Sequence, residues 1–255
     1  MEKQIQAQLQ ELEQSHQITI LFAVESGSRA WGFPSPDSDY DVRFLYQHAP
    51  EWYLSLDEPK DTLTRMHGDL DLSGWDLRKA LRLLRKSNAA LLEQLQSPIL
   101  YRPAAPAVEE MQALAPAYFS AKAGLHHYLS MAFRYARACA PETDVKLKSY
   151  FYLLRAALAS LWIVEKQTIP PMQFQALLPL VDNPEMLQRI QQLLVRKAEV
   201  GEQYDHPKEQ ALEDYLFQLL QRCEAMAGHL PIAHGASQAL DKLFRNSLLS
   251  HGPLT

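Results

Sequence analysis

Residues 18–46 read ITILFAVESGSRAWGFPSPDSDYDVRFLY, and this stretch decides the fold. It opens with residues 18–24, a short run of apolar and β-branched side chains that predicts a buried strand. Gly27-Ser28 ends this strand, and residues 28–32 are expected to form a short helix. Proline, serine and aspartate at 34–37 predict a turn. Because residues 40–46 are again rich in strand formers, they predict a second strand.

Two acids mark the start of the second predicted strand. Asp39 and Asp41 are separated by one residue, so their side chains share a face of the strand. Carboxylates held this close repel each other unless a cation or a proton compensates. Mg²⁺ prefers oxygen ligands and often combines carboxylates with substrate phosphates. The backbone N–H groups of Gly27-Ser28 and the Ser28 hydroxyl could receive such a phosphate.

Each of these motifs is common in ordinary turns when it occurs alone. Here they follow a buried strand, and ten residues separate Ser28 from Asp39. The combination is more specific than either part, and it indicates metal-dependent transfer of a nucleotide.

Helical and strand patterns surround this stretch. Residues 2–16 carry Ile5, Leu9 and Leu12 at the spacing of one helix face. A third strand is expected over about 61–72, and an amphipathic helix over 76–86. Asn88 can cap a further helix. These elements predict a small α/β catalytic domain over residues 1–100.

Beyond residue 100 the pattern is almost entirely helical. Pro103, Pro106 and Pro116 punctuate a connector, and helices are expected over 117–139, 144–166, 184–200 and 207–228. Asn183-Pro184 and His206-Pro207 resemble helix starts with proline in the first turn. Residues 101–255 are therefore predicted to form an all-helical domain, which makes the fold class α+β.

Composition excludes several classes of function. The net charge of −5 gives no global attraction to nucleic acid, and the isolated Cys139 and Cys223 suit a reduced compartment. The polar amino terminus lacks the apolar core of a signal peptide, and the apolar stretch 156–164 is short for a membrane span. We therefore expect a cytoplasmic protein without membrane contact. There is no Walker-type or serine-hydrolase motif.

The order Gly-Ser, spacer, Asp-x-Asp resembles the DNA polymerase β-like nucleotidyltransferase superfamily. The string AVESGSRAWGFPSPDSDYDVRFLY (23–46) is similar to one branch, the YcgL-type or RNA-ligase-associated predicted nucleotidyltransferases. Further similar stretches are DLSGWDLRKALRLLRKSNAALLEQLQSPI (71–99) and KLKSYFYLLRAALASLWI (146–163). The resemblance covers roughly residues 18–180. It implies a mixed-sheet core and a nucleoside triphosphate donor with two Mg²⁺ ions, for which Mn²⁺ is an alternative.

The resemblance also implies roles for particular residues. Gly27 and Ser28 match the phosphate-holding turn, and Asp39 and Asp41 match the metal ligands. The superfamily generally has a third carboxylate on a later strand, for which Asp71 is the first candidate and Asp69 the second. The acceptor hydroxyl would belong to RNA, a protein or a small molecule, because such families use many acceptors.

Basic residues near the motif allow two interpretations. Arg29 follows the Gly-Ser turn, and Arg43 lies on the same strand face as Asp39 and Asp41. Each could contact phosphate or neutralise the acids. Trp31 could stack on a base, but packing against Phe33 is the favoured interpretation. Basic residues also line the predicted helix 76–86, where a solvated face is favoured over an RNA-binding one. These residues are Arg78, Lys79, Arg82, Arg85 and Lys86.

A polar stripe occurs in the helical half. Lys148, Tyr152 and Arg155 stand at i, i+4 and i+7 on one helix face. Since helical domains of this superfamily often close over the nucleotide, the stripe could reach the triphosphate or the base. A solvated helix face explains it equally well.

Three functions compete at this point. The first is an active nucleotidyltransferase, and the second is a catalytically inactive nucleotide- or RNA-binding module on the same fold. The third is an RNA-binding helical protein in which Asp39 and Asp41 only form a turn. The sequence specifies neither the nucleobase, nor the acceptor, nor the oligomeric state.

Overall fold

The computed structural model describes residues 1–57, 59–139, 143–232 and 235–250. The chain forms two compact units. The sheet unit comprises Met1–Gly27, Asp39–Tyr118 and His234–Thr255, and the helical unit comprises Ser28–Ser38 and Phe119–Ala233. This division differs from the expected boundary at residue 100, because the chain passes between the units more than once.

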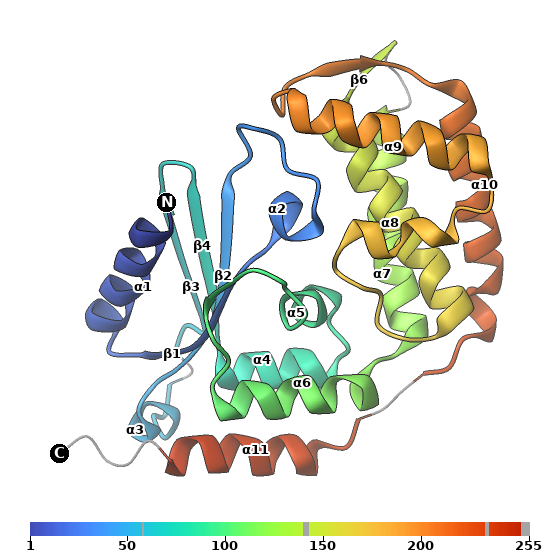
Figure 1. Ribbon diagram of the computed structural model, residues 1–255. Helices are drawn as coiled ribbons and strands as arrows, with labels where there is room; N and C mark the ends of the chain where they lie inside the picture. The colour runs from blue at the N-terminus through green and yellow to red at the C-terminus, as the bar shows by residue number, and fades with distance from the viewer. Residues whose placement is uncertain (58, 140–142, 233–234, 251–255) are drawn as a thin grey trace. The chain divides into compact units, whose positions relative to one another are not determined.

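The sheet unit contains a five-stranded sheet of order β3-β4-β2-β1-β5 (Figure 1). Its strands are β1 (Thr19–Glu25), β2 (Tyr40–Gln47), β3 (Thr62–His67), β4 (Leu70–Asp76) and β5 (Leu100–Arg102). β2 and β4 are parallel, and the other neighbouring pairs are antiparallel. The mixed sheet is therefore confirmed, as are the two strands expected around the Gly-Ser turn.

Helix α1 (Glu2–His16) covers one face of the sheet. Its apolar residues Ile5, Leu9 and Leu12 are buried against the strands, as their spacing predicted. From β2, Val42 and Phe44 join this core. Because side chains alternate along a strand, Asp41 and Arg43 point to the opposite face. The burial of the apolar set thus fixes the face on which the acids lie.

The third expected strand is instead a hairpin. β3 and β4 pair antiparallel, with His67 opposite Leu70. Gly68 has a φ of +58° in the two-residue turn, a conformation that glycine adopts at little cost. The single expected strand over 61–72 was therefore wrong in extent, since Gly68-Asp69 reverses the chain within it.

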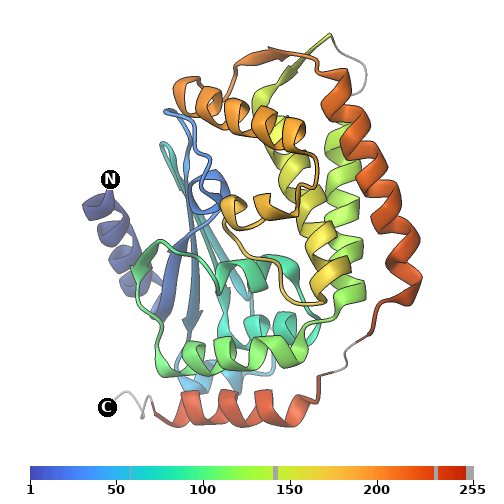
Figure 2. The same ribbon diagram turned by 45° about the vertical axis from the view of Figure 1, so that its right-hand side comes forward.

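Three helices of the sheet unit pack together at the end of the sheet where β4 ends (Figures 1 and 2). They are α4 (Leu77–Arg85), α6 (Pro106–Tyr118) and α11 (Ser237–Leu249). Asp76 caps α4 by accepting a hydrogen bond of 2.9 Å from the backbone N–H of Arg78. Asn88 caps α5 (Ala89–Gln94) in the same way through Leu91, as expected. The short α3 (Pro50–Tyr53) precedes β3.

The helical unit is built on α7 (Ala121–Cys139), α8 (Leu147–Lys166), α9 (Pro184–Glu199) and α10 (Gln210–Met226), which Figure 2 shows well. Short 3-10 turns occur at Phe174–Ala176, Leu178–Leu180 and Ala227–His229. α2 (Gly27–Trp31) begins the 28–38 segment. Asn183 caps α9, as expected.

Two details differ from the all-helical expectation. β6 (Asp144–Lys146) and β7 (Asp205–Pro207) form an antiparallel ribbon, so His206-Pro207 belongs to a strand and α10 begins only at Gln210. The expected helix over 117–139 is divided between α6 and α7, and Pro116 lies inside α6.

Among the described residues, α8 has the length and mean hydropathy, 1.2, that a membrane crossing would need. However, 72% of its apolar window is buried within the protein. Such burial is typical of a core helix.

Candidate functional site

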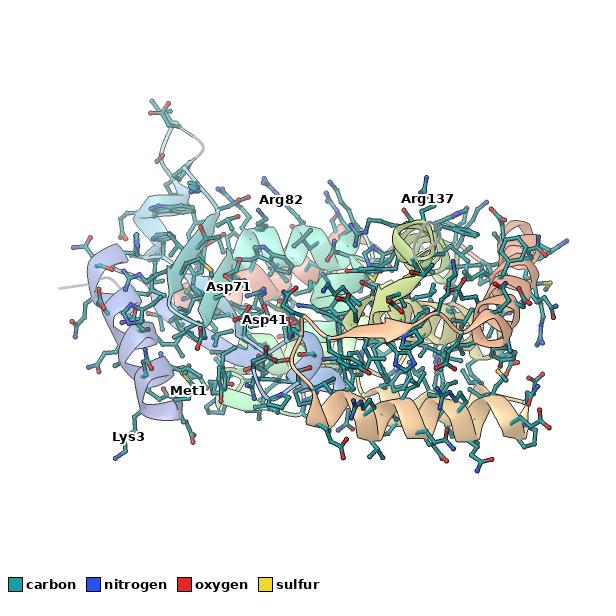
Figure 3. The ribbon with its side chains drawn as sticks, turned by 90° about the horizontal axis from the view of Figure 1, so that it is seen from above. Met1, Lys3, Asp41, Asp71, Arg82 and Arg137 are labelled. Atoms are coloured by element: carbon teal, nitrogen blue, oxygen red, sulfur yellow. The ribbon has the colours of Figure 1, made fainter. Side chains whose placement is uncertain are left out.

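Two carboxylates face each other on neighbouring strands of the sheet unit. Asp41 is the second residue of β2 and Asp71 the second of β4, and the parallel register places them opposite each other. Their side chains are 30% and 33% exposed. Figure 3 shows the two labelled side by side. The structure thus brings together one predicted motif acid and the first candidate for the third carboxylate.

Arg43 joins these two carboxylates. Its Nη2 lies 2.9 Å from Asp41 Oδ1 and 2.9 Å from Asp71 Oδ2. Its Nη1 donates to the backbone carbonyl of Asp71 at 3.0 Å. The guanidinium therefore offsets the repulsion of the two acids. Of the two interpretations of Arg43, neutralisation of the acids is the one that this geometry displays.

The glycine turn approaches the same carboxylate. Gly27 has a φ of +60°, and a Cβ built there would lie 2.1 Å from Asp41 Oδ2. The backbone N–H of Ser26 donates to the Asp41 carbonyl at 2.8 Å. Only glycine combines this conformation with this approach. The local sequence Ser26-Gly27 therefore places a turn directly against Asp41.

Glu25 fixes the backbone of Asp41 by hydrogen bonding. It is fully buried at the end of β1, and its Oε1 accepts a hydrogen bond of 2.7 Å from the backbone N–H of Asp41. The Tyr101 hydroxyl donates to its other carboxylate oxygen, and Ser97 Oγ donates to its backbone carbonyl at 2.6 Å. Sequence reasoning assigned Glu25 no role. The sequence feature that could have identified Glu25 is its position, because it is an acidic residue at the end of an otherwise apolar strand.

The other two candidate acids lie just before the strands that carry this pair. Asp39 precedes β2 and is exposed, and Asp69 is exposed in the turn between β3 and β4. The Asp69 carbonyl accepts a hydrogen bond of 2.8 Å from the backbone N–H of Tyr40. The Arg43 guanidinium pairs with the motif acid Asp41 and with Asp71, rather than with Asp69.

The donor set suits a divalent cation that keeps other ligands. Within the described ranges, no group of three or more His, Cys, Asp or Glu side chains is arranged to hold a metal. Asp41 and Asp71 nevertheless supply hard oxygen donors, already bridged by the positive charge of Arg43. Mg²⁺ typically takes one or two carboxylates and completes its shell with water and substrate phosphates. The residues present therefore fit Mg²⁺.

In the helical unit, hydrogen bonds between polar groups hold the 28–38 loop in place. Ser28 is buried, and its Oγ donates to Ser38 Oγ at 3.1 Å. Arg29 Nη2 donates to the Ser38 carbonyl at 2.7 Å. Ser38 Oγ in turn donates to Glu202 Oε1 at 2.7 Å. These contacts hold Ser28 and Arg29 in one compact loop.

The predicted stripe on α8 meets this loop within the helical unit. Lys148 is paired with Glu202, and its Nζ lies 5.8 Å from the centre of the Tyr152 ring. Tyr152 packs edge-on against Trp31 at 5.0 Å. Burial alone would raise the pKa of Glu202, but hydrogen bonds from Lys148 and Ser38 outweigh it and hold that pKa below its usual range. The side chain of Lys148 stays 38% exposed.

Arg155 has a different position from the one expected. It is 1% exposed, its Nε and Nη2 donate to the Met172 carbonyl at 3.3 Å, and its guanidinium lies 4.4 Å from the centre of the Trp31 ring. A buried guanidinium cannot contact a ligand without leaving these partners. We therefore correct its predicted role in nucleotide binding to a structural one. Trp31, 9% exposed and 5.7 Å from Phe33, packs as expected.

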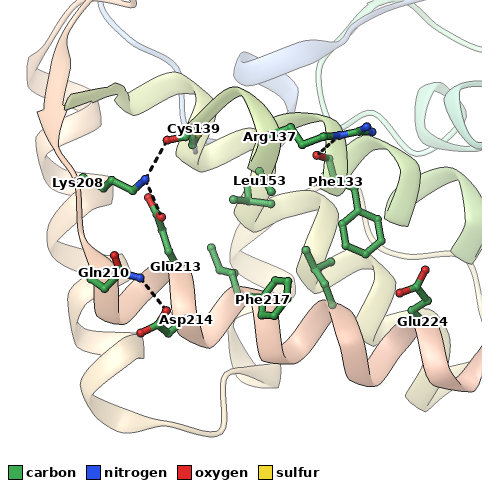
Figure 4. A pocket seen from close by; sticks show the side chains of 13 residues that line it. Phe133, Arg137, Cys139, Leu153, Lys208, Gln210, Glu213, Asp214, Phe217 and Glu224 are labelled. Carbon is green, nitrogen blue, oxygen red and sulfur yellow. Dashed lines mark hydrogen bonds and ion pairs between the residues drawn. The ribbon is translucent and has the colours of Figure 1, made fainter. Parts of the chain in front are cut away.

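A cavity of about 710 Å³ lies elsewhere in the helical unit (Figure 4). Its walls combine apolar side chains such as Leu153 and Phe217 with a bridging lysine. Lys208 Nζ lies 3.3 Å from the Cys139 carbonyl and 3.4 Å from a Glu213 carboxylate oxygen. None of the predicted site residues lines this cavity.

Known proteins similar to this chain include a protein family and two relatives. The model of the RlaP family, described as the RNA repair pathway DNA polymerase beta family, matches residues 1–246. The chain is 46% identical over 207 residues to the uncharacterized protein YcgL of Bacillus subtilis, covering 80% of this chain and 79% of that protein. It is 29% identical over 141 residues to the uncharacterized protein MJ0002 of Methanocaldococcus jannaschii, covering 53% and 56%.

A solved nucleotidyltransferase-like protein from Exiguobacterium sibiricum is similar at 15% identity, over 94% of this chain and 78% of that one. Its TM-score of 0.30 adds no support for a shared function. The family match and the identity to YcgL confirm the resemblance drawn from the Gly-Ser and Asp-x-Asp motifs, and family membership supports a general role in nucleotidyl transfer. The chain belongs to the RNA repair pathway DNA polymerase beta family.

Proposed function

We propose that the chain is a Mg²⁺-dependent nucleotidyltransferase. It would move a nucleoside monophosphate from a nucleoside triphosphate to an acceptor hydroxyl and release pyrophosphate. The observation that carries this proposal is the pair Asp41 and Asp71, set in register beside the Gly27 turn and bridged by Arg43. Family membership supports nucleotidyl transfer in general, and the donor set supports the choice of metal.

Each residue has a part in the proposed reaction. Mg²⁺, as two ions, would lower the pKa of the attacking hydroxyl and offset the charge on the leaving pyrophosphate. Asp41 and Asp71 would hold the metal, and Asp39, exposed just before β2, would add a further carboxylate. The hydroxyl oxygen bonds to the α-phosphorus while the bond to the β-phosphate oxygen breaks. Asp71 helps to take the hydroxyl proton.

Arg43 has a specific part in this scheme. Its guanidinium occupies the space between the carboxylates in the present structure. With a divalent cation held by the two carboxylates, Arg43 would be free to pair with a phosphate oxygen of the triphosphate instead. Guanidinium groups bind phosphate in a fork geometry, which suits Arg43 to that role.

Nucleotide binding falls to the turn and the adjoining loop. Gly27 and Ser28 offer backbone N–H groups to the triphosphate, and Arg29 adds positive charge. The sequence also predicts nucleotide contacts from Lys148 and Tyr152 of the helical unit, where Lys148 stays partly exposed; we keep both as predictions. Burial removes Arg155 from this set.

We propose RNA as the acceptor, because the family description refers to an RNA repair pathway. We also propose a cytoplasmic location, with which the two isolated, buried cysteines agree: Cys139 and Cys223.

The test is incubation of the protein with cell lysate, Mg²⁺ and each of the four α-labelled nucleoside triphosphates. We expect Mg²⁺-dependent label in the RNA fraction with one or more nucleotides. A double variant, Asp39→Asn with Asp41→Asn, should fold and transfer no label. Label in the protein or small-molecule fraction would replace RNA as the acceptor and keep the reaction.

Two results would contradict the proposed reaction. The first is equal labelling by the double variant. The second is Mg²⁺-dependent binding of triphosphate without label in any fraction, which would identify a nucleotide-binding module without transfer activity.

A further inference from the structure

A basic groove lies between α4 and α11 in the sheet unit. It encloses about 360 Å³, and α4 lines it with Arg78, Arg82 and Arg85. α11 contributes Ser237, Leu240, Asp241 and Phe244. The three arginines lie on one helix face, as their spacing predicted, but they border a groove rather than open solvent.

These arginines form no close ion pairs within the described residues, although the charge of Arg78 acts on the buried Asp76 at the start of α4. In the part of the chain that the structure describes, no carboxylate oxygen lies within 4.0 Å of the three guanidinium groups, although Asp241 also lines the groove. On the same helix, Lys79 is paired with Asp61 at 2.8 Å. Arg85 Nη1 donates to Ser237 Oγ at 2.9 Å. A chain with net charge −5 has therefore gathered three positive charges here without neutralising them by ion pairs.

One aromatic ring, that of Phe244, lines the groove, and two more lie beside Arg78 outside the lining; one of these, Trp52, is stacked on His48 at 3.9 Å between ring centres. The Arg78 guanidinium lies 5.4 Å from the centre of the Tyr53 ring and 5.7 Å from that of Trp52. Tyr53 packs edge-on against Phe244 at 5.0 Å. Guanidinium groups beside aromatic rings are the combination by which proteins bind single-stranded nucleic acid, since phosphates meet the charges and bases stack on the rings.

The length of the surface favours a polymer. Successive arginines on α4 are separated by about 6 Å and 4.5 Å along the helix axis. From Asp71, β4 continues for five residues before α4 begins, a distance of about 17 Å. Figure 3 shows Arg82 and Asp71 labelled at different places on the unit. A ligand that fills the groove and also reaches the carboxylates must therefore be a chain of several units.

We propose that this groove binds the phosphate backbone of single-stranded RNA and so holds the acceptor of the reaction. This inference rests on the proposed function for the identity of the acceptor. The groove itself is a binding site independent of the carboxylates, because none of its residues contacts Asp41, Asp71 or Arg43 in the described structure.

The test is fluorescence anisotropy with a labelled 12-nucleotide single-stranded RNA, in EDTA and without nucleoside triphosphate. We expect Arg82→Glu to weaken binding at least tenfold and Arg82→Gln to weaken it several-fold. For Arg82→Gln, the slope of log affinity against log salt should fall by about 0.7, the loss of one phosphate contact. The matched control Lys3→Glu reverses an exposed charge on α1 and should bind like wild type.

Competition experiments distinguish an RNA backbone from free phosphate as the bound anion. Unlabelled RNA should displace the probe, whereas inorganic phosphate at the same concentration of phosphate groups should not. Displacement by inorganic phosphate would contradict a backbone site. Thermal unfolding monitors the fold of each variant, and Arg82→Gln covers the case in which a glutamate destabilises the last turns of α4.

The two proposals can fail separately. Asp41→Asn should bind RNA like wild type while transferring no label. If Arg82→Glu and Arg82→Gln both bind RNA like wild type, the groove is excluded and the transfer reaction stands. If RNA binding depends on Arg82 but wild type transfers no label, the groove stands and the proposed reaction fails.

Discussion

Arg43 and Arg155 show how differently the two units use the same side chain. Arg43 bridges two carboxylates on a partly open sheet face and is 21% exposed in its side chain. Arg155 is closed in by the Trp31 ring and the Met172 carbonyl and is 1% exposed. Because water and ligands reach the site of Arg43, another cation can replace its guanidinium between the two carboxylates. The arrangement around Arg155 cannot change without disrupting a packed core.

The comparison separates function from stability. Removing a partner of Arg43 should change chemistry and leave the fold, since the partners are partly hydrated. Removing Arg155 should weaken the fold and leave the chemistry, since a buried, packed group is lost. Variants of each unit can therefore test this separation.

Asp71→Asn should lower the rate of transfer by about 10³-fold, the scale found when one electrostatic contact to the reacting groups is lost. The isosteric change removes a charge and keeps the strand. The measurement is the initial rate of label transfer from the preferred triphosphate.

Asp69→Asn is the matched control, two residues away in the hairpin turn. It should transfer at nearly the wild-type rate. A loss for Asp69→Asn equal to that for Asp71→Asn would contradict the assignment of Asp71 as the third carboxylate.

Arg155→Ala should lower the free energy of unfolding by about 3 kcal/mol, because it leaves a cavity beneath Trp31. The KM for the triphosphate should stay within twofold of wild type. Urea unfolding and steady-state kinetics measure the two quantities.

The control is Arg134→Ala, which removes an exposed arginine 5.1 Å from the Tyr135 ring centre. It should lower the free energy of unfolding by less than about 1 kcal/mol. A raised KM at unchanged stability would return Arg155 to the nucleotide site.

Gly27→Ala should cost about 2 kcal/mol of unfolding free energy and most of the activity. The alanine adds strain at a positive φ and a methyl group against Asp41. Gly68→Ala has the same kind of strain, with a φ of +58°, but meets no atom within 4 Å. It should cost about 1 kcal/mol and keep the activity. Equal loss of activity in both variants would show that strain alone is responsible.

Glu202→Gln should have the smallest effect: a small loss of unfolding free energy at neutral pH, which shrinks toward zero as the pH falls. The pKa of Glu202 is below its ordinary value of 4.5, so its ionised form adds stability at neutral pH, and this is lost as the pH falls below 4.5 through the lowered pKa. Unfolding free energy should therefore decline less steeply between pH 5 and 3 in Glu202→Gln than in wild type. Parallel declines in urea titrations would contradict the lowered pKa.

Local signals in the sequence predicted much of the sheet unit. Apolar spacing predicted α1, strand-forming residues predicted β2, and the side chains of Asn88 and Asn183 marked helix starts. Asp41 and Asp71 could be paired in advance because the motif and its resemblance required a third acid on a later strand.

Long-range contacts could not be predicted from local pattern. The 28–38 segment belongs to the helical unit through contacts such as Ser38 with Glu202, 164 residues apart. Arg155 stands in a stripe that looks solvated in the sequence, and its burial depends on the Trp31 ring and the Met172 carbonyl, which are distant along the chain. Glu25 acquires its role from Tyr101, a residue on a different strand.

The most direct test of the central claim is Mn²⁺ binding, followed by electron paramagnetic resonance in the presence of a non-hydrolysable triphosphate. Wild type and Asp69→Asn should bind Mn²⁺ with the triphosphate, whereas Asp41→Asn and Asp71→Asn should lose this binding at the same concentrations. Equal Mn²⁺ binding by wild type, Asp41→Asn and Asp71→Asn would show that the carboxylate pair does not hold the metal.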